Sequence, residues 1–144
     1  FINGLTGITA KTLKDAPPVE EVIKEFQEFV GSLPMVGYNA AKSDLPILAD
    51  HGLDYSQQYK VDLYDEAFER RSSDLHGIAN LKLQTVASFL GFQGQSHNSL
   101  EDARMTARVY ESFLESDQAR ELLEAESSLS NNPFGSLDLS QLFD

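Results

Sequence analysis

The sequence predicts an α/β domain, because helical and extended patterns alternate along the chain. Apolar residues recur at helical spacing in residues 19–30 and again in residues 100–114. Between these segments lie two short apolar stretches, residues 35–38 and 61–64, each followed by another helical pattern. This order favours a sheet flanked by helices.

The early elements follow from proline and from helix caps. The helix at residues 19–30 comes after two prolines and ends before Pro34, because proline interrupts helices. Its apolar stripe consists of Val19, Val22, Ile23, Phe26, Phe29 and Val30. After the strand at residues 35–38, Asp44 suits the N-cap of a second helix, in whose first turn Pro46 is tolerated.

The later elements are predicted in the same way. The strand at residues 61–64 leads into a helix through Arg70. A further helix is predicted between a cap at Asn80 and a stop at Gly91. Its apolar residues are Leu83, Val86 and Leu90.

The last predicted helix, which ends near Leu114, places an imidazole and a carboxylate near its start. Ser99, followed three residues later by Asp102, forms the pattern of a capping box, which puts Asp102 in the first turn. There the helix dipole favours the charged carboxylate by about 0.3–1 kcal/mol, and charged carboxylates bind divalent cations. His97 lies just upstream, and an imidazole accepts protons near neutral pH, so we interpret it as a general base. The alternative is an ordinary helix cap preceded by a surface histidine.

Asp44 also lies at a junction between a strand and a helix. In open α/β sheets such junctions line the crevice at the carboxyl ends of the strands. Asp44 and Asp102 are therefore predicted to converge, although 58 positions separate them in the sequence. The alternative for Asp44 alone is a plain N-cap.

These motifs resemble those of the DnaQ-like 3′-to-5′ exonucleases of the DEDDh group, the relatives of the polymerase III epsilon subunit. The resemblance covers residues 1–115. Residues 37–48 resemble the second exonuclease motif of that family, and residues 97–103 resemble the third. Residues 5–9 resemble the loop before its first long helix, and Asp62 resembles an aspartate that starts a later helix.

The resemblance implies a ribonuclease H-like fold, a central mixed sheet flanked by helices. It implies hydrolysis of phosphodiester bonds at the 3′ end of single-stranded DNA, with release of nucleoside monophosphates in proofreading or repair. It also implies two Mg²⁺ or Mn²⁺ ions, with Asp44 and Asp102 as metal ligands and His97 as the base that deprotonates the nucleophile. The residues that it implies for substrate binding are Leu5, Thr6, Tyr38 and Asn39.

The chain departs from the family at the first motif, an Asp-x-Glu pair on the opening strand. Asp15, Glu20 and Glu21 do not replace it, because they flank Pro17-Pro18 at a turn. We therefore expect a fragment whose N-terminal strands are missing, and we expect these 144 residues alone to be inactive.

Two other functions remain open. One is a non-catalytic module with an exonuclease fold that tethers a replication partner. The other is an exoribonuclease of the same fold, since discrimination at the 2′-hydroxyl depends on pocket geometry. The expected partners are single-stranded DNA 3′ ends, with RNA as the alternative, and a DNA polymerase or sliding clamp.

Composition agrees with one compact domain, since 41% of the 144 residues are hydrophobic. No apolar run approaches the roughly 18 residues that span a bilayer, so we expect no membrane partner. The chain has no cysteine, which is compatible with the cytoplasmic location that we expect.

The net charge of −12 is unusual for a protein that binds nucleic acid. Residues 115–144 carry half of it, with seven acidic residues against one arginine. We therefore expect an exonuclease domain at residues 1–115 and an acidic C-terminal helix and tail at residues 116–144. Residues 134–143 faintly resemble peptides that bind sliding clamps. The acidic charge is compatible with a metal-dependent nuclease, because bound cations supply positive charge at the site and a broad basic face is not needed.

Overall fold

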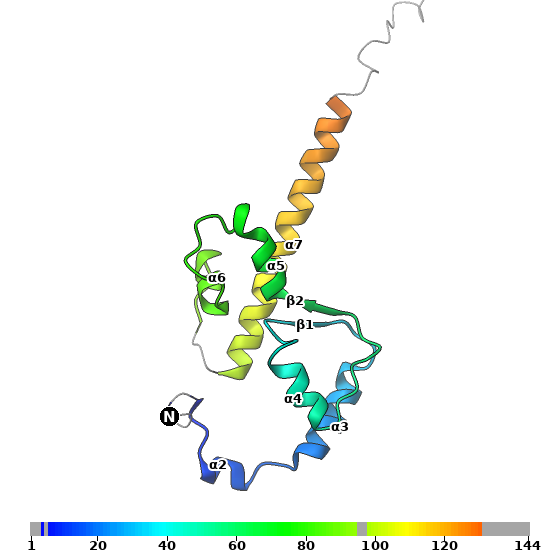
Figure 1. Ribbon diagram of the computed structural model, residues 1–144, viewed down its shortest axis with the longest axis vertical. Helices are drawn as coiled ribbons and strands as arrows, with labels where there is room; N and C mark the ends of the chain where they lie inside the picture. The colour runs from blue at the N-terminus through cyan, green and yellow to red at the C-terminus, as the bar shows by residue number, and fades with distance from the viewer. Residues whose placement is uncertain (1–3, 5, 95–97, 131–144) are drawn as a thin grey trace, which may run out of the picture. The chain divides into compact units, whose positions relative to one another are not determined.

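The structure, a computed structural model, describes residue 4, residues 6–94 and residues 98–130 (Figure 1). It divides into two compact units, Phe1–Glu111 and Ser112–Asp144. The predicted division after residue 115 stays a prediction. Within the described residues, no helix combines the length and the apolar character that a membrane span requires.

A small parallel sheet lies at the centre of the first unit (Figure 1). Strand β1 (Met35–Gly37) pairs with β2 (Lys60–Asp62), and Val36 lies opposite Val61. Helix α4 (Asp44–Asp50) lies in the connection between the two strands. The predicted α/β class is therefore confirmed, because parallel neighbours need a crossover of this kind.

Glycine is required where β1 ends. A Cβ atom added to Gly37 would lie only 2.4 Å from the Cβ of Ala40, which shows how tightly the chain turns back after the strand. Asn39, between them, has a left-handed backbone with φ of 56°. The strand accordingly ends two residues before Asn39, slightly earlier than predicted.

The helices predicted before and after β1 are both present. Helix α3 (Val19–Val30) has the predicted bounds and ends at Gly31, whose φ is 53°. Ile23 is buried in it, whereas Phe29 is 82% exposed. Helix α4 begins at Asp44 itself, so Asp44 is the first helical residue and not the predicted N-cap. The turn before it is closed by a bond over five residues, in which the Leu45 amide donates to the Ala40 carbonyl at 2.9 Å.

The helices that follow β2 supply most of the core. They are α5 (Leu63–Glu69), which continues into a 3₁₀ turn (Arg70–Ser72), α6 (Leu83–Phe89) and α7 (Ser99–Ser130). The prediction that Asn80 caps α6 is wrong. Its side chain accepts from the Lys82 amide at 3.1 Å, and Lys82 still lies before the helix. Gly91, with φ of 88°, follows the end of α6 as predicted. The fully buried side chains of these helices include Leu63, Ala67, Val86, Ala87 and Val109.

Helix α7 (Ser99–Ser130) is longer than predicted and runs past Leu114 without interruption. No glycine or proline lies within it, and alanine, leucine, glutamate and arginine favour helix continuation. Its cap also differs from the predicted one. The side chain of Asn98 accepts from the amides of Leu100 and Glu101 at 3.1 and 3.2 Å, so Asn98 takes the role predicted for Ser99. A cap one residue earlier still leaves Asp102 in the first turn.

Candidate functional site

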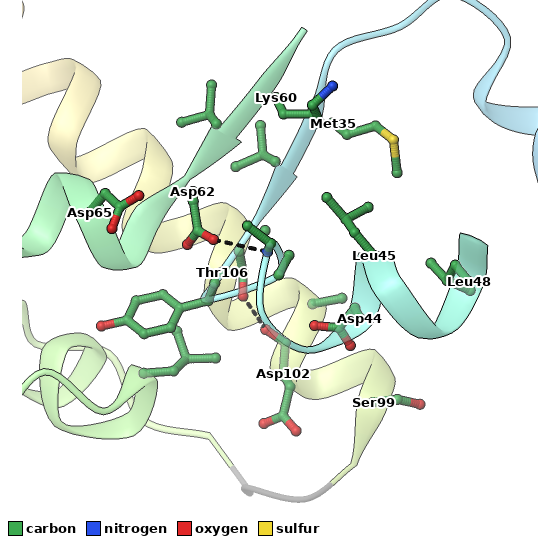
Figure 2. A pocket seen from close by; sticks show the side chains of 18 of the residues that line it. Met35, Asp44, Leu45, Leu48, Lys60, Asp62, Asp65, Ser99, Asp102 and Thr106 are labelled. Atoms are coloured by element: carbon green, nitrogen blue, oxygen red, sulfur yellow. Dashed lines mark hydrogen bonds between the residues drawn. The ribbon is translucent and has the colours of Figure 1, made fainter. Parts of the chain in front are cut away.

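A pocket of about 1110 Å³ runs along the two strands (Figure 2). Residues of both strands, of α3, α4, α5 and the start of α6, of the loop before β2 and of the first two turns of α7 line it. Its apolar wall includes Met35, Val36, Leu45, Leu48, Val61 and Leu83. Four aspartates also line it, and they are Asp44, Asp62, Asp65 and Asp102.

Two carboxylates selected from the sequence, Asp44 and Asp102, lie in this same pocket. Figure 2 shows Asp44 on the α4 side and Asp102 on the α7 side. Asp44 is exposed and accepts a hydrogen bond from the Ser43 hydroxyl at 2.7 Å. Asp102 is half-buried, and Thr106 one turn later donates to its main-chain carbonyl at 2.8 Å. Their roles as metal ligands stay a prediction.

Asp62 forms contacts that the sequence did not reveal. Its side chain caps α5 by accepting from the Tyr64 amide at 3.1 Å, in agreement with an aspartate that starts a helix. It also accepts from the amides of Asn39 at 2.6 Å and Ala41 at 3.1 Å, 23 and 21 positions earlier in the chain. An aspartate directly after a strand was the available signal, but nothing local identifies its distant partners.

Tyr38 lines the pocket, with its hydroxyl group directed into the protein. That hydroxyl donates to the Leu81 carbonyl at 2.6 Å, and the ring meets Tyr64 edge to face at 6.2 Å between centroids. Burial raises the pKa of Tyr38, and the nearby Tyr64 and Asp62 raise it further. Tyr38 is therefore neutral at physiological pH and can present only its ring to the pocket while this bond persists.

The remaining predicted residues divide into two groups. Thr6 and Asn39 are described but do not line the pocket. Thr6 accepts instead from the Ile8 amide at 3.3 Å, and Asn39 contributes its backbone to the loop before α4. Leu5 and His97 lie outside the described residues, as does the tail at 134–143, so their predicted roles stay predictions.

Cationic residues line two separate spaces in the structure. Arg108 lines a separate space of about 80 Å³, and so does Arg104, which pairs with Glu101 on the same helix. Lys60 and Lys82 line the main pocket instead. The Lys60 ammonium donates to the carbonyls of Tyr55 and Gln58, so its charge is partly engaged there.

The donor set matches magnesium or manganese in type but is small in number. Carboxylate oxygens are the ligands that these hard cations prefer. However, no group of three or more histidine, cysteine, aspartate or glutamate residues is placed to hold a metal within residues 6–94 and 98–130. The hydrogen bonds of Asp62 also occupy much of its capacity. Asp44 and Asp102 are thus the candidates for a partial ligand set.

Comparison with known proteins gives consistent results. The RNase_T family model, described as an exonuclease, matches residues 1–110. The chain is 31% identical over 116 residues to a PolC-type DNA polymerase III from Caldanaerobacter subterraneus subsp. tengcongensis, covering 80% of this chain and 8% of that protein. It is 30% identical over 119 residues to a DNA polymerase III subunit epsilon from Aquifex aeolicus, covering 79% of this chain and 56% of that protein.

A PolC-type DNA polymerase III from Streptococcus pneumoniae is 34% identical over 125 residues, again with 8% of its length covered. The chain therefore spans about half of one relative and under a tenth of the others. No solved structure gives a significant match.

Proposed function

This chain belongs to the exonuclease family, and on that premise we propose that it forms a metal-dependent 3′-to-5′ exonuclease acting on single-stranded DNA. The observation that carries the proposal is the presence of Asp44 and Asp102, from two distant helix starts, in one pocket beside the two strands. The products would be nucleoside monophosphates. The names of the relatives, which are DNA polymerase III proteins, favour DNA over RNA and favour proofreading with a polymerase as the setting.

In this proposal the site residues divide into metal ligands, a general base and a residue that stacks on the substrate. Asp44 and Asp102 hold divalent cations, and His97 accepts the proton of the attacking water. Tyr38 offers a flat, apolar face against which a terminal base can stack. A bound divalent cation supplies an acidified water and stabilises charge on the leaving oxygen.

The count of ligands sets a requirement on the proposal. Two cations about 4 Å apart carry four positive charges and need more oxygen ligands than two aspartates provide. Asp65 is exposed and is a further carboxylate that lines the same pocket. The proposal therefore requires oxygen ligands in addition to Asp44 and Asp102.

A second candidate is a non-catalytic module of the same family. The small number of clustered ligands among the described residues favours it. In that case the pocket holds a strand end or a partner without hydrolysing it. The proposed activity and this alternative differ in turnover, so one experiment separates them.

The test is degradation of a single-stranded oligonucleotide by the natural gene product. With Mg²⁺ or Mn²⁺, a 5′-labelled DNA strand is expected to shorten stepwise, and a strand blocked at its 3′ end is expected to stay intact. EDTA is expected to stop the reaction, and an RNA strand of the same sequence shows whether the substrate preference is for DNA.

Asp102→Asn and Asp117→Asn form a matched pair for this test. Both residues are aspartates on α7, but only Asp102 lines the pocket. We expect Asp102→Asn to lose activity and Asp117→Asn to keep it. An intact protein that binds the strand without any turnover would favour the non-catalytic module.

A further inference from the structure

The carboxylate of Asp62 joins the end of β2 to the loop that leads from β1 into α4 (Figure 2). One of its oxygens accepts from the Asn39 amide at 2.6 Å and from the Tyr64 amide at 3.1 Å. The other accepts from the Ala41 amide at 3.1 Å. Three backbone amides from two elements therefore converge on one half-buried side chain.

The loop that Asp62 holds has little freedom of its own. Asn39 is the one non-glycine residue with positive φ among those the structure describes, and this conformation is unfavourable for a side chain with a Cβ. Ala40 lies so close to Gly37 that no side chain fits at position 37. A charged acceptor that binds two loop amides offsets the unfavourable backbone, because bonds to ionised groups are stronger than neutral ones.

The same loop sets the place of Asp44. Only Lys42 and Ser43 separate Ala41 from Asp44, and the Leu45 amide donates back to the Ala40 carbonyl at 2.9 Å. Ser43 also links the loop to Asp44. Its hydroxyl contacts the Asn39 carbonyl at 2.8 Å and the Asp44 carboxylate at 2.7 Å. A shift of Asn39 or Ala41 therefore moves the first turn of α4.

We propose that Asp62 is a positioning residue, which fixes the loop at residues 39–43 and through it the Asp44 carboxylate in the pocket. This inference rests on the role proposed for Asp44. Asp62 is given no role as a ligand in this arrangement, because three N–H groups already occupy most of the acceptor capacity of its two oxygens. Asparagine cannot replace it, since the amide nitrogen would place a donor against a loop N–H.

The test compares Asp62→Ser with Asp54→Ser in the natural gene product. Serine is a good N-cap, so Asp62→Ser keeps the start of α5, but its side chain is too short to reach Asn39 and Ala41. Asp54 makes the same kind of local bond, accepting from the Ser56 amide two residues later at 2.9 Å, and it does not line the pocket. Asp54→Ser therefore controls for the loss of an aspartate that binds a local amide.

Hydrogen exchange gives the first measurement. In Asp62→Ser, amides in peptides covering residues 37–45 are expected to exchange at least roughly tenfold faster, while peptides covering α5 keep their protection. Asp54→Ser is expected to leave both unchanged. Unchanged exchange at residues 37–45 in Asp62→Ser would overturn the proposal.

Turnover gives the second measurement. Misplacing a catalytic group by about 1 Å can lower the rate on the order of 10²-fold, so we expect kcat to fall by about that factor in Asp62→Ser. The KM for the oligonucleotide is expected to change less than about twofold, and the Mn²⁺ concentration for half-maximal rate is expected to rise. Asp62→Asn is expected to resemble Asp62→Ser in both respects.

The two measurements separate the possible failures. Faster exchange with wild-type kcat and metal dependence would show that the loop does not set Asp44, and the positioning role would be wrong. A wild-type protein without nuclease activity would overturn the proposed function instead. Exchange at Asn39, Ala41 and Leu45 would then still decide whether Asp62 holds the loop.

Discussion

The two helix starts that bring carboxylates to the pocket are built in different ways. At α7, Asn98 caps the helix with bonds to amides two and three residues later, so Asp102 is placed by its immediate neighbours. At α4, no side chain caps the helix, and Asp44 follows a loop that Asp62 holds from another strand. Asp102 is half-buried and Asp44 is exposed. One carboxylate thus depends on local sequence and the other on tertiary contacts.

The largest expected effect tests whether the two starts serve one site. We expect Asp44→Ala and Asp102→Ala each to lower turnover on the order of 10³-fold or more, and the double variant to be no worse, because residues that act as a unit are not additive. Steady-state rates, with circular dichroism to verify folding, provide the measurement. Additive losses would show two independent roles.

A comparable or smaller effect is expected at His97. Losing a general base lowers rates by roughly 10²- to 10⁴-fold without removing a metal ligand. In His97→Ala we therefore expect slower turnover with unchanged metal dependence, together with loss of the limb near neutral pH in the rate profile. Metal titrations that weaken in step with activity would instead make His97 a ligand or a structural residue.

Gly37→Ala tests how far the α4 start depends on tight packing. The added Cβ would meet the Ala40 Cβ at 2.4 Å, and overpacking of this kind costs about 1–3 kcal/mol. We expect the free energy of unfolding, measured with urea, to fall by that amount. Adding Ala40→Gly is expected to restore part of the loss, and a double variant as unstable as Gly37→Ala would contradict the steric explanation.

The corresponding change at α7 is Asn98→Ala. Removing the cap is expected to lower the free energy of unfolding by about 1 kcal/mol, since two amides lose their acceptor. Ser99→Ala is the matched control and is expected to change it little. A larger effect at Ser99 than at Asn98 would instead support the predicted capping box, with Ser99 as the N-cap.

A similarly small effect is expected at Tyr38, whose hydroxyl donates to the Leu81 carbonyl. At neutral pH, Tyr38→Phe is expected to cost about 0.5–1.5 kcal/mol, the net value of a typical hydrogen bond. Because burial raises the pKa of the folded-state phenol, the unfolded chain releases its proton first as the pH rises.

Stability from this group is therefore complete below about pH 10, the ordinary tyrosine pKa, and is lost above it. The slope is at most about 1.4 kcal/mol per pH unit. Urea unfolding at pH 9, 10 and 11 is expected to show a shallower decline in Tyr38→Phe than in the wild type. Parallel declines would mean that Tyr38 titrates alike in both states.

The sequence by itself determined the elements whose signals are local. Prolines on both sides gave α3 its bounds, and the alternation of short apolar runs with helical patterns predicted the α/β class. The position of Asp102 in a first turn was also predicted correctly, although the cap proved to be Asn98. A shift of one residue in a cap does not change which turn holds the carboxylate.

Only the tertiary structure decided how the distant parts combine. No local pattern shows that Asp62 binds the amides of Asn39 and Ala41, because hydrogen bonds over 21 and 23 positions form only after β1 and β2 pair. The left-handed backbone of Asn39 and the start of α4 at Asp44 were likewise seen only in the structure. The sequence could name Asp44 and Asp102 as candidates, but their presence in one pocket depends on strand pairing and helix packing, which local residues do not encode.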